Sequence, residues 1–326
     1  MLRNSMQTSR KTNVSRLLRV AAVVAAMSLI TACSGAVNDT GTETADGNGT
    51  EPVSASPLDN FVENGLTLTY IVDPPNVYEA DDGTITGASA EAIKAILAKL
   101  DITNLSYQNV PFDTTIPTLT SGRAELTSFI FNIKPDRCSE VAFANPVYID
   151  RDGAMVQKGN PKNISSYDDL VADESIKIAS LRGDAHLDWF KAYNIADSRV
   201  QQFDGLPQAI DAVVTGRADV YINGMVNLAG GLLQGGDDVE IAAPFDGPII
   251  DGEEMLSIGS FATSYDNIDL LNAINAVIVD MINSGELGEI MGPLGYPASG
   301  VPDPTMTAKS ICPDAPWPAG YIDLAG

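Results

Sequence analysis

The segment IKPDRCSEVAFANPVY, residues 133–148, contains the side chain with the most specific binding chemistry in the sequence, Arg137. A guanidinium group presents two parallel N–H donors that match the two oxygens of a carboxylate, and it keeps its charge at ordinary pH. A lysine would supply the charge without this geometry. Arg137 therefore predicts a carboxylate-binding site, and the alternative is a structural salt bridge.

Further candidates follow from the elements that must position Arg137. From Asn60 onward, strand and helix patterns alternate. The first five elements are expected at residues 66–72, 88–100, 105–112, 114–122 and 124–131. This β-α-β-α-β order predicts a parallel, doubly wound α/β sheet, in which ligands bind outside the carboxyl ends of the strands. Asp73, Phe112 and residues 129–132 follow such strand ends, so we expect them beside a binding site.

The same pattern then repeats, which predicts a second lobe. Its elements are expected at residues 176–181, 185–195, 199–203, 206–216 and 218–223. An internal match supports the repeat, because LTSGRAELTSFI (119–130) and VVTGRADVYING (213–224) each place a glycine at a helix end and an arginine before a buried strand. The segment GGLLQGG (230–236) is expected to be a loop.

The last part of the folded chain is expected to return to the first lobe. A strand is expected at 255–263 and a long helix at 269–291, broken near Ser284–Gly285. Lobe one then comprises residues 59–148 plus 252–312, lobe two comprises 149–251, and 313–326 form a C-terminal tail. Two chain crossings join the lobes, and such a hinge permits closure on a ligand in the cleft.

The N-terminus carries signals for export. Residues 1–32 hold five basic residues, no acidic residue, and an apolar run of about 11 residues, VAAVVAAMSLI, which is too short to span a membrane. The sequence ITAC, which ends at Cys33, resembles the lipobox of bacterial lipoproteins and implies acylation of this cysteine. Residues 33–58, poor in apolar side chains, predict a flexible tether. The alternative is a plain secretory signal.

Composition limits the partners and the chemistry. Without residues 1–32, the chain has 14 basic and 43 acidic residues, a net charge of −29, which repels nucleic acid and anionic lipid. His186 is the only histidine, so no metal cluster is expected, and no nucleotide-binding glycine motif or G-x-S-x-G motif suggests a cofactor or a serine nucleophile. In an exported chain, Cys138 and Cys312 favour a disulfide, with two unpaired thiols as the alternative. A monomer is expected.

Four segments together resemble the type-two periplasmic solute-binding proteins of the polar amino-acid ABC transporter family. IKPDRCSEVAFANPVY resembles the family segment I-T-x-x-R-x-x-x-V-x-F-S-x-P-Y, and GTITGASAEAIKAI resembles its G-x-x-x-G-[FY]-[DE]-[VI]-D-L-A segment. LTSGRAEL and VVTGRADV match its two L-x-x-G-[RK]-x-D-[AV] elements, and NSGELGEIMGPLGY resembles its closing segment. Within the family, the cysteine after the arginine and GPIIDGEE (247–254) are most similar to the ectoine- and hydroxyectoine-binding branch.

The resemblance implies roles for charged residues in the cleft. It implies that Arg137 clamps the ligand carboxylate and that an aspartate in lobe two meets the ammonium of an α-amino acid. The matching position here is Gly224, beside Asn223, so a free ammonium would lack this partner. This departure argues against a simple α-amino acid held in the usual way. In the ectoine branch an acidic residue stands at Asp73, which is therefore expected to meet a cation.

The ectoine branch also cages a delocalised cation with aromatic rings. Phe112 fits one ring position, whereas two others fall at Asn76 and Asn132. The nearby aromatic residues are Tyr78, Phe129 and Phe131. Two amides in place of two rings predict a wetter pocket and argue against ectoine itself, and core packing is the alternative role for each phenylalanine.

In lobe two, SLRGDAHLDW matches the family's turn between a strand and a helix, where backbone N–H groups help to bind a carboxylate. Gly183 and Asp184 occupy this turn, and Asp184 is expected to cap the helix, which disfavours a second anion. Arg182 is expected either to reach the cleft or to lie at the surface. His186 lies beside the cleft, either in the site or in a structural role.

The resemblance implies a solute receptor for an ABC importer rather than an enzyme. The lipoprotein would be held by its lipid at the outer face of the cell membrane or in the periplasm, bind a small zwitterion or carboxylate, and deliver it to a permease. The expected solute is an ectoine-like compatible solute or a modified amino acid. The alternatives are a cyclohexadienyl-dehydratase-like lyase, with Asp73, Glu79 or His186 as general acid, and a surface sensor.

Overall fold

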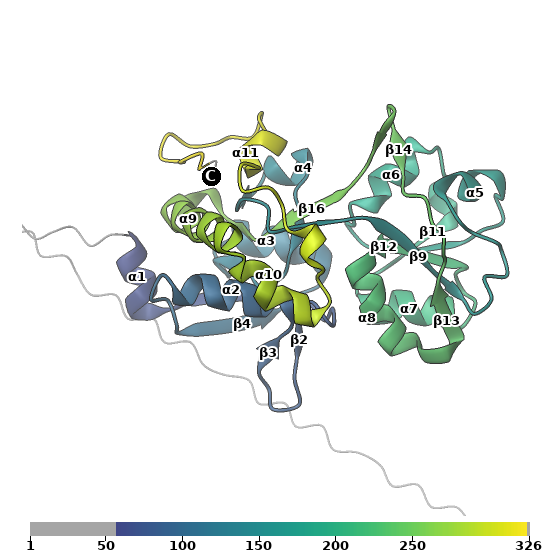
Figure 1. Cartoon of the computed structure of the whole chain (residues 1–326), viewed down its shortest axis with the longest axis horizontal. Helices are drawn as coiled ribbons and strands as arrows, with labels where there is room; N and C mark the ends of the chain where they lie inside the picture. The colour runs from purple at the N-terminus through teal and green to yellow at the C-terminus, as the bar shows by residue number, and fades with distance from the viewer. Residues whose placement is uncertain (1–56, 325–326) are drawn as a thin grey trace, which may run out of the picture. The chain divides into compact units, whose positions relative to one another are not determined.

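The computed structural model describes residues 57–324, and these residues form two α/β lobes (Figure 1). The expected signal peptide, Cys33 and the tether up to residue 56 lie outside the described residues. The last two residues of the expected tether belong to helix α1 (Pro57–Asn64), which precedes the first strand of lobe one. The lipid anchor therefore stays a prediction. The exact limits of the two lobes also stay predictions.

Lobe one is built on a five-stranded sheet in the order β4-β1-β5-β17-β7. Its strands are β1 (Leu66–Tyr70), β4 (Leu105–Asn109), β5 (Leu126–Thr127), β7 (Ala142–Phe143) and β17 (Ala262–Thr263). The first three are parallel, whereas β17 runs antiparallel to β5 and to β7. Because β17 comes from far along the chain, the last part of the sequence returns to lobe one as expected.

Apolar helix faces form the core of lobe one. Helices α2 (Ala88–Ala98), α9 (Ile268–Ser284) and α10 (Glu286–Met291) contact one another, and α3 (Thr115–Thr120) follows β4. Ile93 and Ile274 are fully buried in one cluster, and each such side chain contributes about 1.5–3 kcal/mol by leaving water. The predicted break is confirmed, because Gly285 ends α9 in the left-handed conformation, with φ of 83°.

Lobe two has a second five-stranded sheet in the order β11-β10-β12-β9-β13. Its strands are β9 (Asp152–Gln157), β10 (Ile178–Leu181), β11 (Val200–Phe203), β12 (Val220–Gly224) and β13 (Val239–Ile241). Strand β10 is parallel to β11 and β12, and β9 is antiparallel to its two neighbours. The helices of this lobe are α5 (Tyr167–Ala172), α6 (His186–Ala192), α7 (Leu206–Val214) and α8 (Met225–Gly235).

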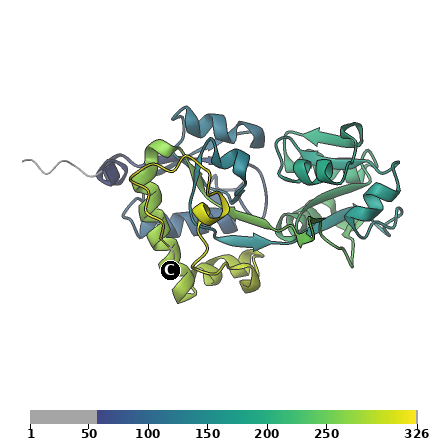
Figure 2. The ribbon, with the colours of Figure 1, turned by 90° about the horizontal axis from the view of Figure 1, so that it is seen from above.

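A three-stranded sheet, β6-β16-β8, carries the two crossings between the lobes. Its strands are β6 (Phe131–Asn132), β8 (Tyr148–Asp150) and β16 (Ser257–Ser260). Gly259 of β16 lies opposite both Asn132 and Tyr148. Figure 2 shows the teal strand that leaves lobe one and the green strand that returns to it side by side. The predicted hinge of two crossings is thus present.

The remaining elements are short. Two hairpins join β2 (Tyr78–Glu79) to β3 (Ile85–Thr86) and β14 (Ile249–Ile250) to β15 (Glu253–Glu254), and two further helices are α4 (Pro135–Cys138) and α11 (Ala308–Ile311). Single 3-10 turns lie at η1 (Phe112–Thr114), η2 (Asp197–Arg199), η3 (Gly236–Asp238), η4 (Tyr265–Asn267), η5 (Gly292–Leu294) and η6 (Ala298–Gly300). Among the described residues, no helix is both long and apolar enough to cross a membrane.

Three local predictions were wrong. The single strand expected at 124–131 is divided, because β5 ends at Thr127 in lobe one and β6 begins at Phe131 in the hinge sheet. The single strand expected at 255–263 is divided in the same way, because β16 ends at Ser260 in the hinge sheet and β17 begins at Ala262 in lobe one. The loop expected at 230–236 is instead the second half of helix α8. A Cβ at Gly230 would overlap with the backbone carbonyl of Pro74 in lobe one, so this glycine permits close approach rather than a turn.

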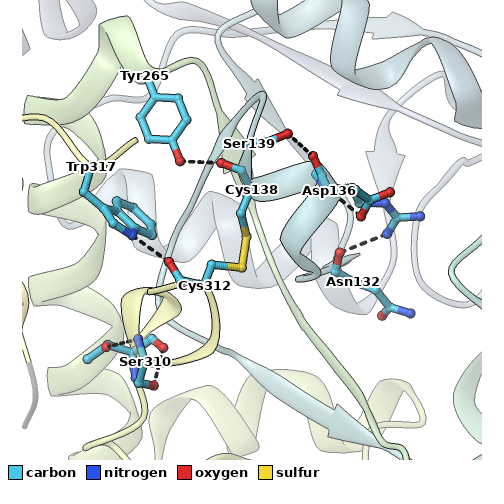
Figure 3. The surroundings of a disulfide bond; sticks show 10 residues. Asn132, Asp136, Cys138, Ser139, Tyr265, Ser310, Cys312 and Trp317 are labelled. Carbon is cyan, nitrogen blue, oxygen red and sulfur yellow. Dashed lines mark hydrogen bonds between the residues drawn. A yellow bond between two sulfur atoms is a disulfide. The ribbon is translucent and has the colours of Figure 1, made fainter. Parts of the chain in front are cut away.

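The C-terminal segment is fastened to lobe one. Cys138, at the end of α4, and Cys312, after α11, form a disulfide with a Cα–Cα distance of 6.3 Å (Figure 3). Trp317 Nε1 donates to the carbonyl of Cys312 at 2.9 Å, and Asn145 Nδ2 donates to the carbonyl of Leu324 at 2.8 Å. These contacts hold the segment after residue 312 against the lobe that carries Arg137.

Candidate functional site

A cavity of about 70 Å³ lies where the two lobes and the hinge strands meet. A water molecule needs about 10–15 Å³ of such space, so the cavity suits a solute of a few atoms' width rather than a drug-sized ligand. Ten residues of the cavity wall have polar side chains that can bind a solute. They are Asp73, Asn132, Tyr148, Asp150, Asp184, Tyr221, Asn223, Asn227, Ser257 and Tyr296.

Asp73 enters the cavity from the turn that follows β1. The turn is closed by hydrogen bonds between the backbones of Asp73 and Val77, and Asn76 Nδ2 donates to Asp73 Oδ2 at 2.9 Å. The side chain is only 7% exposed, and its Oδ1 has no hydrogen-bond partner among the described residues. Burial, and to a lesser degree the charge of Asp184, raise the pKa of Asp73 to about 7, although the Asn76 hydrogen bond opposes this.

Asp184 reaches the cavity from lobe two as part of a buried network. His186 lies between two carboxylates, and its Nδ1 donates to Asp184 at 2.7 Å while its Nε2 donates to Asp152 at 3.0 Å. Tyr167 OH donates to the other oxygen of Asp152 at 2.6 Å. Burial lowers the pKa of His186, but the two carboxylates outweigh it and raise this pKa to about 10. His186 is therefore an imidazolium at neutral pH.

The network keeps Asp184 ionised. Burial alone would raise the pKa of Asp184, but the charge and hydrogen bond of His186 and the charge of Arg137 bring it below its usual value. Asn223 Nδ2 donates to Asp184 Oδ2 at 3.2 Å. The structure thus gives the single histidine a role inside lobe two, where it neutralises carboxylates and does not line the cavity.

Asp150 is a third carboxylate, at the first hinge crossing. Its oxygens accept from the backbone N–H groups of Arg151 at 2.9 Å and Val226 at 3.1 Å. Burial raises the pKa of Asp150 to about 6, and those two hydrogen bonds limit the rise. A Cβ at Gly224 would overlap with Asp150 Oδ2, so the glycine leaves room for this carboxylate. Gly224 stands where the resemblance implies an aspartate, and in the structure the carboxylate of Asp150 lies beside this position.

Arg137 is buried next to the cavity but is not among the residues that line it. Its Nη1 donates to the carbonyl of Asn132 at 2.9 Å, and its Nη2 donates to the carbonyl of Gly183, in lobe two, at 2.7 Å. Its guanidinium lies 3.9 Å from the ring centroid of Phe131, a cation–π contact. Burial lowers the pKa of Arg137 to about 10, so it remains charged at neutral pH.

The three phenylalanines that the sequence singled out form one cluster next to Arg137, and Tyr78 is not part of it. Ring centroids of Phe112 and Phe131 lie 5.3 Å apart, and those of Phe129 and Phe131 lie 5.8 Å apart, both edge to face. Phe112 and Phe129 line the cavity, whereas Phe131 supports the guanidinium. Phe129 and Phe131 are buried in the core of lobe one and Phe112 packs against them, and each edge-to-face pair contributes about 0.5–1.5 kcal/mol beyond burial.

Amide side chains link the two lobes at the cavity wall. Asn227 Nδ2 donates to Asn223 Oδ1 at 2.9 Å, and Asn76 Nδ2 donates to Asn227 Oδ1 across the lobes. Asn132 Nδ2 donates to the hydroxyl of Ser257 at 3.3 Å, within the hinge sheet. Asn76, Asn227 and Asn223 therefore form a chain of amide hydrogen bonds, and Asn132 bonds to a hydroxyl.

The structure brings half of the sequence-predicted site residues to the cavity wall. The residues at the wall are Asp73, Phe112, Phe129, Asn132, Asp184, Asn223 and Gly224. Those behind or outside the wall are Asn76, Tyr78, Phe131, Arg137, Arg182, Gly183 and His186. Arg182 is half-exposed and pairs with Asp204 at 3.1 Å, so the structure places it at the surface. The ligand-binding roles of all these residues stay predictions.

Sequence reasoning missed several cavity residues that come from distant segments. Tyr148 and Tyr296 meet with ring centroids 4.4 Å apart, although they are far apart in the chain. Asn227 was missed because its helix was not expected. Asp150 follows the motif segment by two residues, and its place at the chain crossing was the one signal in the sequence that could have marked it.

The arrangement suits binding better than acid–base catalysis. Of the three candidate general acids, only Asp73 lines the cavity. Glu79 accepts a hydrogen bond from Tyr70 OH at 3.1 Å, outside the wall, and His186 has both ring nitrogens bonded to carboxylates. Across residues 57–324, no group of three acidic, histidine or cysteine side chains could hold a metal ion.

Comparisons with known proteins agree with this geometry. The model of the family "Bacterial extracellular solute-binding proteins, family 3" matches residues 67–292. A protein of Sinorhizobium fredii, described as a probable amino-acid ABC transporter periplasmic-binding protein, is 30% identical over 250 residues, which cover 76% of this chain and 82% of the relative. The L-cystine-binding protein TcyJ of Escherichia coli is 25% identical over 68% of this chain and 78% of its own length.

A solved structure supports the fold. The crystal structure of EhuB in complex with hydroxyectoine superposes with a TM-score of 0.69 at 23% identity, covering 78% of this chain and 97% of EhuB. The fold is therefore that of the type-two periplasmic binding proteins, as the sequence predicts. With the family model spanning residues 67–292, this chain belongs to the bacterial extracellular solute-binding proteins of family 3.

Proposed function

We propose that the protein is the solute receptor of an ABC importer and that it takes an amino-acid-like solute into the cavity between its lobes. The observation that carries the proposal is a small cavity walled by both lobes and by the hinge, with buried ionisable groups in its wall. Two lobes on a two-stranded hinge can enclose a solute and release it by opening. The amino-acid transport description of the 30% identical relative supports the same class of solute.

Binding would be coupled to closure through contacts that join the lobes. Arg137 of lobe one donates to the carbonyl of Gly183, and Asn76 donates to Asn227 of lobe two. Both contacts join one lobe to the other, so they would break when the lobes open. A permease in the membrane would then recognise the closed form. The proposal includes the more specific class of solute that the sequence suggests, which is a zwitterion such as an ectoine-like compatible solute or a modified amino acid.

In this proposal Arg137 holds the carboxylate of the solute. Its guanidinium is charged, buried beside the cavity and fixed by Phe131, so little entropy is lost when a carboxylate reaches it. We expect Arg137→Ala to weaken binding of a carboxylate-bearing solute by about 100-fold, since charged hydrogen bonds contribute about 1.5–3 kcal/mol each. Arg123→Ala, an exposed arginine of the same lobe, is the matched control. Equal affinities of the two variants would exclude the role of Arg137.

A thermal-shift screen over amino acids and compatible solutes tests the function itself. A solute present at 100 times its dissociation constant adds about 2.7 kcal/mol to the free energy of unfolding. We expect a rise in melting temperature with one class of solute and none with sugars or nucleotides. Catalytic turnover of a bound carboxylate by the purified protein would instead support the lyase alternative, in which Asp73 would donate the proton.

The anchoring of the receptor is also part of the proposal. Cys33, outside the described residues, would carry the lipid, and the segment up to residue 56 would separate the folded lobes from the membrane. We expect Cys33→Ser to release the protein from the membrane fraction while its solute affinity stays the same. If salt washing alone released the parent protein, which keeps Cys33, from the membrane fraction, the lipid anchor would be contradicted.

A further inference from the structure

The charges that surround the cavity do not balance. Asp152 and Asp184 face two cations, because His186 donates to both and the charge of Arg137 also acts on Asp184. Two carboxylates against two cations leave this group neutral. The residues of the cavity wall include no Lys, Arg or His within the part of the chain that the structure describes.

Asp73 is one of two carboxylates outside that balance. It forms no ion pair within residues 57–324, its Oδ1 accepts no hydrogen bond there, and its side chain is 7% exposed. A buried ionised carboxylate without a partner is costly, so it either takes a proton or meets a cation. Asp184, the one charged group that acts on Asp73 from the opposite lobe, repels its charge, and the hydroxyls of Tyr221 and Tyr296 lie nearby.

Asp150 is the second such carboxylate. Its hydrogen bonds come from two backbone N–H groups, and it forms no ion pair with a side chain in the described part of the chain. Gly224 makes the space for it, since any side chain at that position would overlap with its Oδ2. Asp152 repels the charge of Asp150, and the attraction of His186 is the smaller effect.

A neutral zwitterion would leave this surplus of negative charge in place. One carboxylate and one ammonium add no net charge to the cavity, whereas a solute with an additional cationic nitrogen group offsets part of the surplus. The two uncompensated carboxylates come from different parts of the protein, lobe one and the hinge crossing. A solute with two separated cationic groups can therefore contact both at once.

We propose that the cavity selects a solute with more positive than negative charge and that Asp73 and Asp150 are the carboxylates that its cationic nitrogen groups contact. This inference rests on the proposed receptor function and names its class of solute: a basic amino acid, or an amine or guanidine of similar size. Asp184 also lines the cavity, but it already has a counter-ion in His186 and therefore needs no cation from the solute.

Isothermal titration calorimetry with matched solutes tests the inference. L-Arginine and L-citrulline have nearly the same shape and differ by one positive charge, and L-lysine and L-norleucine form a second such pair. Agmatine, which is arginine without its carboxylate, reports separately on the carboxylate site assigned to Arg137. Ectoine and glycine betaine represent neutral zwitterions.

We expect at least one cationic solute to bind, and to bind at least 100-fold more tightly than its neutral partner. Binding of neutral amino acids, ectoine or glycine betaine with equal or greater affinity would overturn the inference and leave the receptor function intact. If no solute of the panel binds at 10 mM, a concentration at which even a weak dissociation constant of about 1 mM is detected, both the inference and the amino-acid-like receptor fail.

A pair of variants locates the effect. Asp73→Asn keeps the shape of the side chain and removes its charge, and Asp81→Asn removes the same charge from an exposed turn of lobe one. We expect Asp73→Asn to reduce the arginine-to-citrulline preference by at least tenfold and Asp81→Asn to leave it unchanged. An unchanged preference in Asp73→Asn, with the fold verified by its melting transition, would remove Asp73 from the cation site.

Discussion

Asp73 and Asp184 are the same residue type in nearly the same degree of burial, and they line the same cavity from opposite lobes. Their acidities nevertheless shift in opposite directions. Burial raises the pKa of Asp73 to about 7, whereas His186 and Arg137 overcome burial and lower the pKa of Asp184. The difference arises because the protein supplies Asp184 with a counter-ion and supplies Asp73 with one amide hydrogen bond.

This comparison separates a structural charge from a charge kept for a solute. Asp184 is one of the two carboxylates that bind the ring nitrogens of His186, and Asp152 is the other. Asp73 has an oxygen without a partner among the described residues and faces the cavity. A buried group that is left unsatisfied costs stability, and such groups are expected where function requires them.

The largest expected effect is a loss of stability when Asp184, the aspartate with a counter-ion in the protein, is replaced. Removing one partner of a buried ion pair typically costs about 3–5 kcal/mol. We therefore expect Asp184→Asn to lower the free energy of unfolding at pH 7 by about that amount, measured by urea titration, because the His186 imidazolium keeps only Asp152. A loss below about 1 kcal/mol would mean that the network does not depend on Asp184.

The next effect concerns His186 and its dependence on pH. Its pKa in the folded protein is raised to about 10 from an ordinary value of 6.5. Its stabilisation is therefore fully present below about pH 6.5 and is lost as the pH rises through about 10. We expect His186→Gln to lower the free energy of unfolding by about 3 kcal/mol at pH 6 and by much less at pH 10.

An independent measurement checks the same group. Because His186 is the only histidine, NMR of imidazole nitrogens in an untagged protein reports on it without assignment. We expect one imidazolium signal that does not titrate between pH 5 and 8. A midpoint near pH 6.5 would contradict the buried ion-pair network.

The contribution of Asp73 to stability should also fall as the pH rises, but over a lower pH range than that of His186. A carboxyl whose pKa is raised to about 7 on folding binds its proton more tightly in the folded state, so its contribution to stability falls as the pH rises from about 4 to about 7. We expect Asp73→Asn to match the parent protein near pH 4 and to be more stable at pH 8, by at most about 4 kcal/mol for a shift of about three units. Lower stability of the variant at pH 8, measured without solute, would contradict the account.

The smallest effect is expected at Arg182, a surface counterpart to the buried charges. Its side chain is 50% exposed and pairs with Asp204 and, across the lobes, with Asp113 at 3.7 Å. Exposed ion pairs contribute about 0–1 kcal/mol. We expect Arg182→Ala to change the solute affinity by less than threefold in the calorimetric titration. A loss above tenfold would return Arg182 to the binding site.

The sequence predicted most of the fold because its elements carry local signals. Hydrophobic periodicity located α2 and α9, and Gly285 marked the break before α10. The predictions failed where tertiary contacts override local preference. The glycines of α8 suggested a loop, yet Gly230 lies within a helix, where its lack of a Cβ makes room for the Pro74 carbonyl. The strand at 124–131 was divided because residues beyond Thr127 pair with a different sheet.

The site was predictable in part for similar reasons. Asp73 and Asp184 follow strands, so the rule for the carboxyl ends of a parallel sheet places them at the cleft. The compensation of Asp184 could not be predicted, because it comes from the charges of His186 and Arg137 in the folded chain. The charge of His186 in turn depends on Asp152, 32 positions before Asp184 in the sequence. Asp150 was missed because its role depends on the space that Gly224 leaves, which only the folded chain reveals.

Proton release on binding tests the central claim most directly. Near pH 6, Asp73 is mostly protonated, since its pKa is about 7, and a cationic solute must displace that proton. Calorimetry of the tightest cationic solute in buffers of different ionisation enthalpy counts the protons. We predict that the parent protein releases about one proton more than the Asp73→Asn variant does. An equal number of protons released by the two proteins would contradict the assignment of Asp73 as the partner of a solute cation.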